Sequence, residues 1–138
     1  MTALFDRLDT IILRVRHLDA ALKWYRRVLG LPVVFEDPED ELAVLGLGHG
    51  TSITLYTLSA EEQPAAATAA GPFPIFATRN AGAAYAILLE RGARVDPIQE
   101  GGGVRFFSFY DPDGNRLEAC EIIDEDGEGS PPGTRRAT

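Results

Sequence analysis

The sequence predicts an α+β fold in which one βαβββ module occurs twice, all within a single domain of residues 1–123. Strand-like and helix-like hydrophobic periodicities follow one another in the same order over about residues 8–60 and 71–122. The two halves also match with a nearly constant shift, which pairs Thr10 with Phe73 and Thr54 with Glu118. This shift changes by only one residue over about forty residues, which favours a duplicated module over chance.

The elements of the first half can be read in order. Residues 10–16 (TIILRVR) alternate between apolar and mixed positions, which predicts a strand. Residues 17–31 (HLDAALKWYRRVLGL) carry an apolar stripe at helical spacing, with Asp19 expected to cap the start and Gly30 to end the helix. Three further strands are predicted at PVVFE, LAVLGL and TSITLYTL.

The second half repeats this order after a segment rich in alanine and proline at 62–74, interpreted as a linker or surface loop. FPIFATR predicts a strand, and NAGAAYAILLERGA a helix capped by Asn80 and stopped near Gly92. RVDPIQE, VRFFSFYD and RLEACEII predict strands, the last two joined by the turn DPDGN, where Gly114 and Asn115 tolerate a positive φ. Residues 124–138 are expected to form a disordered tail.

Composition excludes several classes of function. The 138 residues are 45% hydrophobic and 25% charged, as in ordinary globular domains, and the net charge of −8 disfavours nucleic-acid binding. The lone Cys120 excludes an internal disulfide framework and a cysteine-based zinc cluster. No apolar run approaches the roughly 20 residues that span a bilayer, and the N-terminus lacks the apolar region of a signal peptide. We therefore expect a cytoplasmic protein with no membrane association.

Two motifs carry a family resemblance. Trp24-Tyr25 is followed by Val28-Leu29-Gly30-Leu31, and DPDGN is followed three residues later by Glu118. In a duplicated βαβββ frame, these motifs resemble the vicinal oxygen chelate superfamily, also called the glyoxalase/bleomycin resistance protein/dioxygenase family, over about residues 8–122. The resemblance implies that the two modules form a curved open barrel around a cavity. It also implies a homodimer, and leaves open whether modules are exchanged between chains.

The resemblance places the family's metal ligands at four positions of this chain: Thr10, Thr54, Phe73 and Glu118. Only Glu118 is a good ligand, whereas a stable transition-metal site generally needs three or more ligands drawn from histidine, carboxylate or thiolate. We therefore expect no metal and no cofactor, with a divalent metal as the disfavoured alternative.

Other potential ligands have simpler interpretations. His17 lies at the start of the first helix, where a solvated or capping histidine is expected, and His49 lies in a Gly-His-Gly turn. Cys120 shares a strand face with Glu118, so it could line the cavity, although a small buried apolar role is the simpler interpretation.

Strand alternation, taken with the implied barrel, predicts a cavity of mixed polarity. A small organic ligand suits such a lining. Alternatively, Arg14 and Glu118 simply neutralise each other as a structural pair. The expected cavity residues are Thr10, Ile12, Arg14, Ser52, Thr54, Tyr56, Phe73, Glu118 and Cys120.

Two classes of function follow. The first is a binding protein of the bleomycin-resistance type, which holds a small organic molecule without a metal. The second is a lyase or dioxygenase-type enzyme in which Glu118 is the catalytic residue, as general base or as metal ligand. The sequence does not identify the ligand, and whether the protein is an enzyme stays open, because Thr10, Thr54 and Phe73 are not metal ligands.

Overall fold

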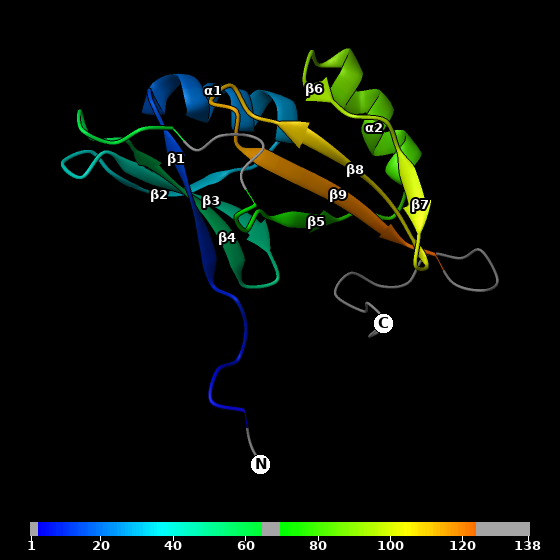
Figure 1. The fold of residues 1–138 in the computed structure, drawn as a ribbon. Helices are drawn as coiled ribbons and strands as arrows, with labels where there is room; N and C mark the ends of the chain where they lie inside the picture. The colour runs from blue at the N-terminus through cyan, green and yellow to red at the C-terminus, as the bar shows by residue number, and fades with distance from the viewer. Residues whose placement is uncertain (1–2, 65–69, 124–138) are drawn as a thin grey trace. The chain divides into compact units, whose positions relative to one another are not determined.

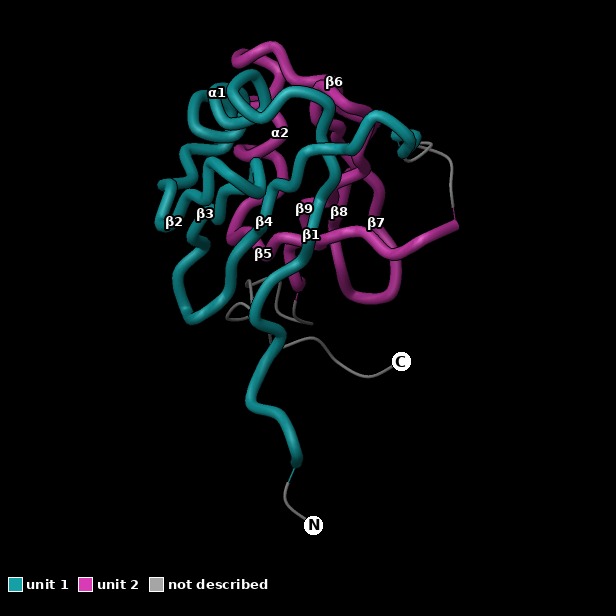
Figure 2. The backbone as a smooth tube through the Cα atoms, turned by 90° about the vertical axis from the view of Figure 1, so that its left-hand side faces the viewer, with its two compact units in different colours: residues 1–65 teal, residues 66–138 magenta. Residues whose placement is uncertain are grey.

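The computed structural model describes residues 3–64 and 70–123, and the chain forms two compact units, unit 1 (residues 1–65) and unit 2 (residues 66–138) (Figure 2). Each unit has one helix and one sheet, and the predicted α+β class with two βαβββ modules is confirmed. The tail expected at 124–138 lies outside the described residues. Within the described part of the chain, neither helix has the length and apolar character needed to cross a membrane.

Unit 1 is a four-stranded sheet with one helix on it (Figure 1). The strand order is β1-β4-β3-β2, in which β1 runs parallel to β4 and the other neighbours are antiparallel. The elements are β1 (Thr10–Val15), α1 (Leu18–Leu29), β2 (Val33–Asp37), β3 (Leu42–Gly48) and β4 (Thr51–Thr57).

Only one end of α1 follows the sequence prediction. Gly30 ends the helix in the left-handed conformation with φ of 69°, as expected, and its N–H donates to the carbonyl of Arg26. The prediction that Asp19 caps the start is wrong. His17 is the N-cap residue, without a side-chain capping hydrogen bond, and Asp19 lies inside the first turn, where its charge favours the helix dipole.

The core of unit 1 lies between α1 and one face of the sheet. Tyr25 is fully buried, and its ring packs edge-on against that of Trp24 with centroids 4.9 Å apart. Alternate residues of β1, β3 and β4 are buried, which is what period-two alternation requires of a half-covered sheet. The buried strand residues are Leu13, Val15, Ala43, Leu45, Ile53 and Leu55.

Unit 2 repeats this plan with a less regular sheet, in the order β5-β9-β8-β6 with β7 also pairing β8. The single strand expected at 94–100 is two short ones separated by Pro97, which lacks the N–H that a ladder needs. The strand expected from Phe73 begins only at Ile75. The elements are β5 (Ile75–Ala77), α2 (Ala81–Glu90), β6 (Arg94–Val95), β7 (Gln99–Gly101), β8 (Val104–Tyr110) and β9 (Arg116–Ile122).

The start of α2 is held by two side chains. The Asn80 side chain accepts from the N–H of Ala83 at 2.9 Å, which confirms the predicted cap. The buried carboxylate of Glu121, at the far end of the chain, accepts from the N–H of Ala81 at 2.8 Å. This second contact joins the first turn of α2 to β9.

The turn between β8 and β9 is built around a buried aspartate. One carboxylate oxygen of Asp111 accepts from the N–H groups of Asp113 and Asn115, and the other accepts from the Asn115 side chain at 2.8 Å. Gly114 has the predicted positive φ, of 83°. Asn115, which could tolerate a positive φ, does not adopt one, and its place in the turn comes from its hydrogen bonds to Asp111.

Candidate functional site

Each sheet has a face that is turned away from the helix of its own unit, and we call it the helix-free face. In unit 1, the register of β1 on β4 places six of the predicted cavity residues on this face in three rows. The prediction that these residues share a face is therefore confirmed for unit 1. The rows are Thr10 beside Ser52, Ile12 beside Thr54, and Arg14 beside Tyr56.

Two of these positions are the metal-ligand positions implied by the resemblance. The hydroxyl oxygens of Thr10 and Thr54 lie 2.9 Å apart and form a hydrogen bond, and Thr54 is buried. Each hydroxyl therefore finds a partner in the other, as buried polar groups require. The pair forms a neutral polar spot between Ile12 and Ser52.

Arg14 has a carboxylate partner within unit 1. Both oxygens of Glu62 accept from its guanidinium at 2.6 Å, and the guanidinium lies over the Tyr56 ring at 4.4 Å. Arg14 thus forms a bidentate pair with Glu62, and its expected pairing with Glu118, which belongs to the other unit, stays a prediction. Glu62, interpreted from sequence as part of a linker, belongs instead to the described end of unit 1.

We expect a low pKa for Glu62. The hydrogen bonds from Arg14, and next the backbone N–H of Ser59, lower the pKa of this carboxyl from 4.5 to about 2. Because the pKa falls on folding, the pair stabilises the protein above pH of about 4.5, and this contribution disappears as the pH falls towards 2. The difference in thermal midpoint between wild type and E62Q should therefore shrink on acidification, and carboxyl NMR titration should report the low pKa directly.

Glu61 supplies the matched control, because it is an exposed glutamate one residue earlier in the chain. E61Q should leave the acid dependence of the thermal midpoint unchanged, and R14Q should return the pKa of Glu62 towards its ordinary value. An ordinary titration of Glu62 in the wild-type protein would show that the pair with Arg14 does not persist in solution.

The helix-free face of unit 2 is centred on Glu118. The register places this residue between Ile75 of β5 and Ser108 of β8. Cys120 lies on the same face, in the next row beside Ala77, and is a buried free cysteine. The predicted alternation is confirmed, since Leu117 and Ala119 lie on the opposite face of the strand, which packs against α2.

Arg116, which was not among the predicted site residues, lies next to Glu118 and connects three neighbours. Its Nε donates to the Ser108 hydroxyl at 3.1 Å, and its Nη2 lies 3.8 Å from a Glu118 oxygen. Its guanidinium also covers the Phe73 ring at 4.0 Å from the centroid. Phe73 therefore contributes to unit 2 as a platform for a cation rather than as part of β5.

A second cation lies on the same row of the sheet. The register pairs Arg116 with Tyr110 and Tyr110 with Arg94, whose guanidinium lies 4.1 Å from the Tyr110 ring centroid. The Tyr110 hydroxyl donates to Asp96 at 2.6 Å, and this hydrogen bond raises the pKa of Tyr110 above its ordinary value. The face thus offers aromatic, cationic and carboxylate groups side by side.

Sequence reasoning missed these neighbours although a signal was available. Arg116, Glu118 and Cys120 are spaced by two residues, which places them on one face of a strand. Extending that parity across the short turn to β8 reaches Ser108 and Tyr110. The contacts of Glu62, by contrast, have no such signal, because Arg14 is 48 residues away.

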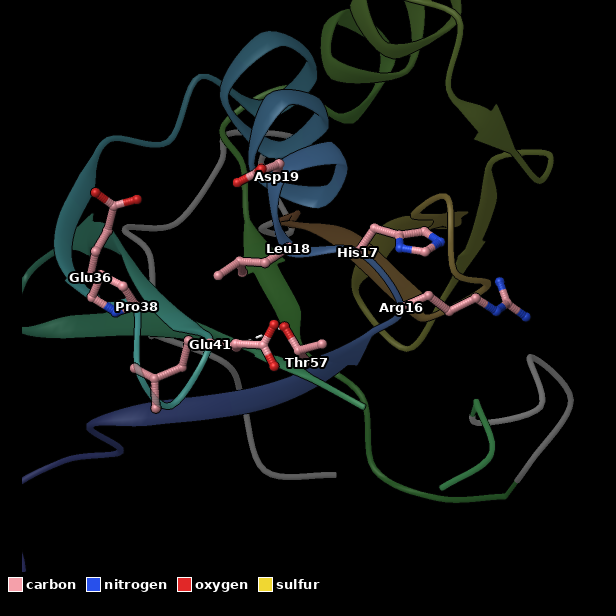
Figure 3. A pocket seen from close by; sticks show the side chains of 9 residues that line it. Arg16, His17, Leu18, Asp19, Glu36, Pro38, Glu41 and Thr57 are labelled. Atoms are coloured by element: carbon pink, nitrogen blue, oxygen red, sulfur yellow. Dashed lines mark hydrogen bonds between the residues drawn. The ribbon is translucent and has the colours of Figure 1, made fainter. Parts of the chain in front are cut away.

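A hollow within unit 1 lies elsewhere, beside the start of α1 (Figure 3). It has a volume of about 450 Å³, with Glu36 and Pro38 on one side and Arg16 and His17 on the other. His17 was expected outside the ligand cavity, and it lines this separate hollow. His49 lies in an exposed turn with φ of 53°, as expected.

The residues at the family's metal positions do not fit a divalent metal. Thr10 and Thr54 offer neutral hydroxyls that bond each other, Phe73 offers an aromatic ring, and Glu118 is ion-paired with Arg116. Zinc and related ions are bound by anionic or imidazole ligands in sets of three or four. Among residues 3–64 and 70–123, no three histidine, cysteine or carboxylate side chains gather where they could hold an ion.

Comparison with solved structures places this geometry among known folds. An integron cassette protein from V. cholerae is 25% identical, with 87% of this chain and 98% of that chain covered and a TM-score of 0.64. A glyoxylase/bleomycin resistance protein/dioxygenase domain from Frankia sp. EAN1pec is 24% identical, with 88% and 95% covered and a TM-score of 0.72. TnmS3, an antibiotic-binding protein from Streptomyces sp. CB03234, is 22% identical, with 86% and 97% covered and a TM-score of 0.70.

The comparison of sequences gives a more direct result. None of the curated proteins compared with this chain matches it. Residues 7–119 match the model of the Glyoxalase/Bleomycin resistance protein/Dioxygenase superfamily, and this range takes in most of the described residues of both units. The chain therefore belongs to the glyoxalase/bleomycin resistance protein/dioxygenase superfamily.

Proposed function

We propose that this protein binds a small organic molecule without a metal, and that the helix-free face of unit 2 supplies its main contacts. The observation that carries the proposal is the set of side chains that occupies the family's metal-ligand positions. Two hydroxyls bond each other, a phenyl ring supports Arg116, and the remaining carboxylate is paired with that same arginine. Such groups suit contact with an organic ligand better than coordination of an ion.

A structural neighbour agrees with this proposal. TnmS3 is an antibiotic-binding protein, so at least one protein of this fold is named for holding an organic compound. The helix-free face of unit 2 has the features that an organic ligand needs: apolar surface at Ile75 and Phe106, with hydroxyl and charged groups between them. Apolar contact would supply the affinity, and the few polar groups would orient the ligand.

One observation supports the alternative of an enzyme. Glu118 is a buried carboxylate at the centre of the face, and a carboxylate in such surroundings can serve as a general base. A lyase or dioxygenase-type reaction would use Glu118 either to accept a proton or to bind a metal. A metal analysis distinguishes the proposal from an enzyme in which Glu118 binds a metal.

The test combines a neutral probe with metal analysis. We expect N-phenyl-1-naphthylamine to bind saturably, with one molecule per chain, and to do so equally well after exhaustive chelation. E118Q should lower the dissociation constant of this probe by about threefold or more, because it removes the cost of desolvating a carboxylate under the ligand. H49Q, in the exposed turn, is the matched control and should leave that constant unchanged.

Metal content supplies the opposing outcome. We expect no stoichiometric divalent metal in the purified protein and no rise in thermal midpoint with Zn²⁺, Ni²⁺ or Mn²⁺, since an ion that binds the folded state must raise it. One tightly held metal per chain, lost in E118Q, would overturn the proposal in favour of a metal-dependent enzyme.

A homodimer and a cytoplasmic location are further parts of the proposal. Apolar side chains of β2, Val34 and Phe35, are more than half exposed, and β2 is one of the two edge strands of its sheet. Edge strands and apolar faces of this kind are commonly covered by a second chain. Light scattering at micromolar concentration tests this, since a monomer of 15.0 kDa would contradict it.

A further inference from the structure

The guanidinium of Arg116 is held in place while part of it stays accessible. The Phe73 ring covers one side at 4.0 Å, Nε is engaged by Ser108, and the side chain is 38% exposed. Within residues 3–64 and 70–123, the only ion pair of its terminal amino groups is with Glu118 at 3.8 Å, beyond the range of a hydrogen bond. The fork of donors at Nη1 and Nη2 is thus fixed in direction and still able to donate.

The charges around this fork also matter. Glu118 is the nearest carboxylate, and Asp96 is engaged by the Tyr110 hydroxyl. Arg94 lies on the other side of Tyr110, two strands from Arg116, where neighbouring strands are about 4.8 Å apart. Two arginines therefore lie on either side of one tyrosine, on a face where Asp96 accepts a hydrogen bond from Tyr110 and Glu118 is ion-paired with Arg116.

We propose that Arg116 recognises an anionic group of the ligand, a carboxylate or a group of similar shape and charge, and so determines which organic molecules the protein binds. This inference rests on the proposed function. A planar guanidinium that is already oriented loses little entropy when it binds an oxyanion through two parallel hydrogen bonds. The Phe73 ring contributes by holding that plane, and Ser108 contributes by fixing the direction in which the fork points.

Two fluorescent probes with one scaffold test the inference. Anilinonaphthalene sulfonate carries a sulfonate, whereas N-phenyl-1-naphthylamine has the same ring system without it. We expect R116Q to weaken the sulfonated probe by about 10-fold or more, the usual effect of losing charged hydrogen bonds, and the neutral probe by less than about twofold. R116K should recover only part of the loss, because an ammonium keeps the charge without the fork.

Arg105 supplies the matched control. It lies on the opposite face of the same sheet, paired with Glu100 and Glu121, so R105Q removes one positive charge without touching the helix-free face, and its thermal midpoint checks that the start of α2 is intact. If R105Q weakens the sulfonated probe as much as R116Q does, the effect is general electrostatics and the inference is wrong.

The two proposals fail in different ways. Binding of the neutral probe together with an unchanged sulfonate affinity in R116Q would overturn the role of Arg116 and leave the proposed function standing. Failure of both probes to bind the wild-type protein would overturn both. A thermal midpoint of R116Q within a few degrees of wild type ensures that the comparison concerns binding rather than folding.

Discussion

Replacing Phe107 by alanine should lower the free energy of unfolding by about 3–5 kcal/mol, the usual cost of removing a large aromatic side chain from a core. Phe107 is 1% exposed, and its ring packs edge-on against Tyr85 of α2 with centroids 5.4 Å apart. It therefore contributes the central contact between the sheet and helix of unit 2. Denaturant unfolding, with the slope compared between variants, measures the loss.

A matched truncation on α2 separates packing from side-chain loss in general. Ile87 is 44% exposed, so I87A should cost below about 1 kcal/mol. F107L, which keeps part of the volume, should fall between the two. A loss for F107A no larger than that for I87A would mean that the face of unit 2 assigned to α2 is not the packed one.

Removing the carboxylate of Asp111 should have the next largest effect. D111A leaves three donors in the β8–β9 turn without their acceptor, at an expected cost of about 2–3 kcal/mol. D111N should also destabilise, because its amide would place a donor against the donors of Asn115. The thermal midpoint and denaturant unfolding both report the change.

A double-mutant cycle with Asn115 isolates the side-chain bond. N115A should cost less than D111A, since it removes only one of the three hydrogen bonds. The double variant should lose less than the sum of the single losses, because the Asn115 side chain and Asp111 share one bond. Strict additivity would show that this bond does not contribute to stability.

The local features of the fold were predictable because they are encoded locally. Strand alternation, the left-handed Gly30 and the Asn80 cap all follow from residues close in sequence to the structure they form. At the start of α1, two residues could have served as the N-cap, and the sequence alone did not decide between them. Asp19 and His17 are both near the start of α1, and the extended backbone at His17 decides where the helix begins.

The contacts that characterise the site were less accessible from sequence. Arg14 and Glu62 are separated by 48 residues, and nothing in an alanine-rich segment indicates that its first residue returns to β1. The match between the two halves pairs Phe73 with Thr10, and it therefore predicted that Phe73 lies in a strand. Its contact with Arg116 depends instead on where β5 begins and on the direction of a long side chain.

The carboxylate of Glu121 at the start of α2 has a consequence for the order of folding. Its partner, the N–H of Ala81, lies 40 residues earlier, so the chain must close a loop of that length before the helix start is satisfied. Closing such a loop costs entropy before any contact repays it, which slows steps that depend on distant residues. We therefore expect the first turn of α2 and β9 to open and close together, so that the second repeat is completed only by the end of its own sequence.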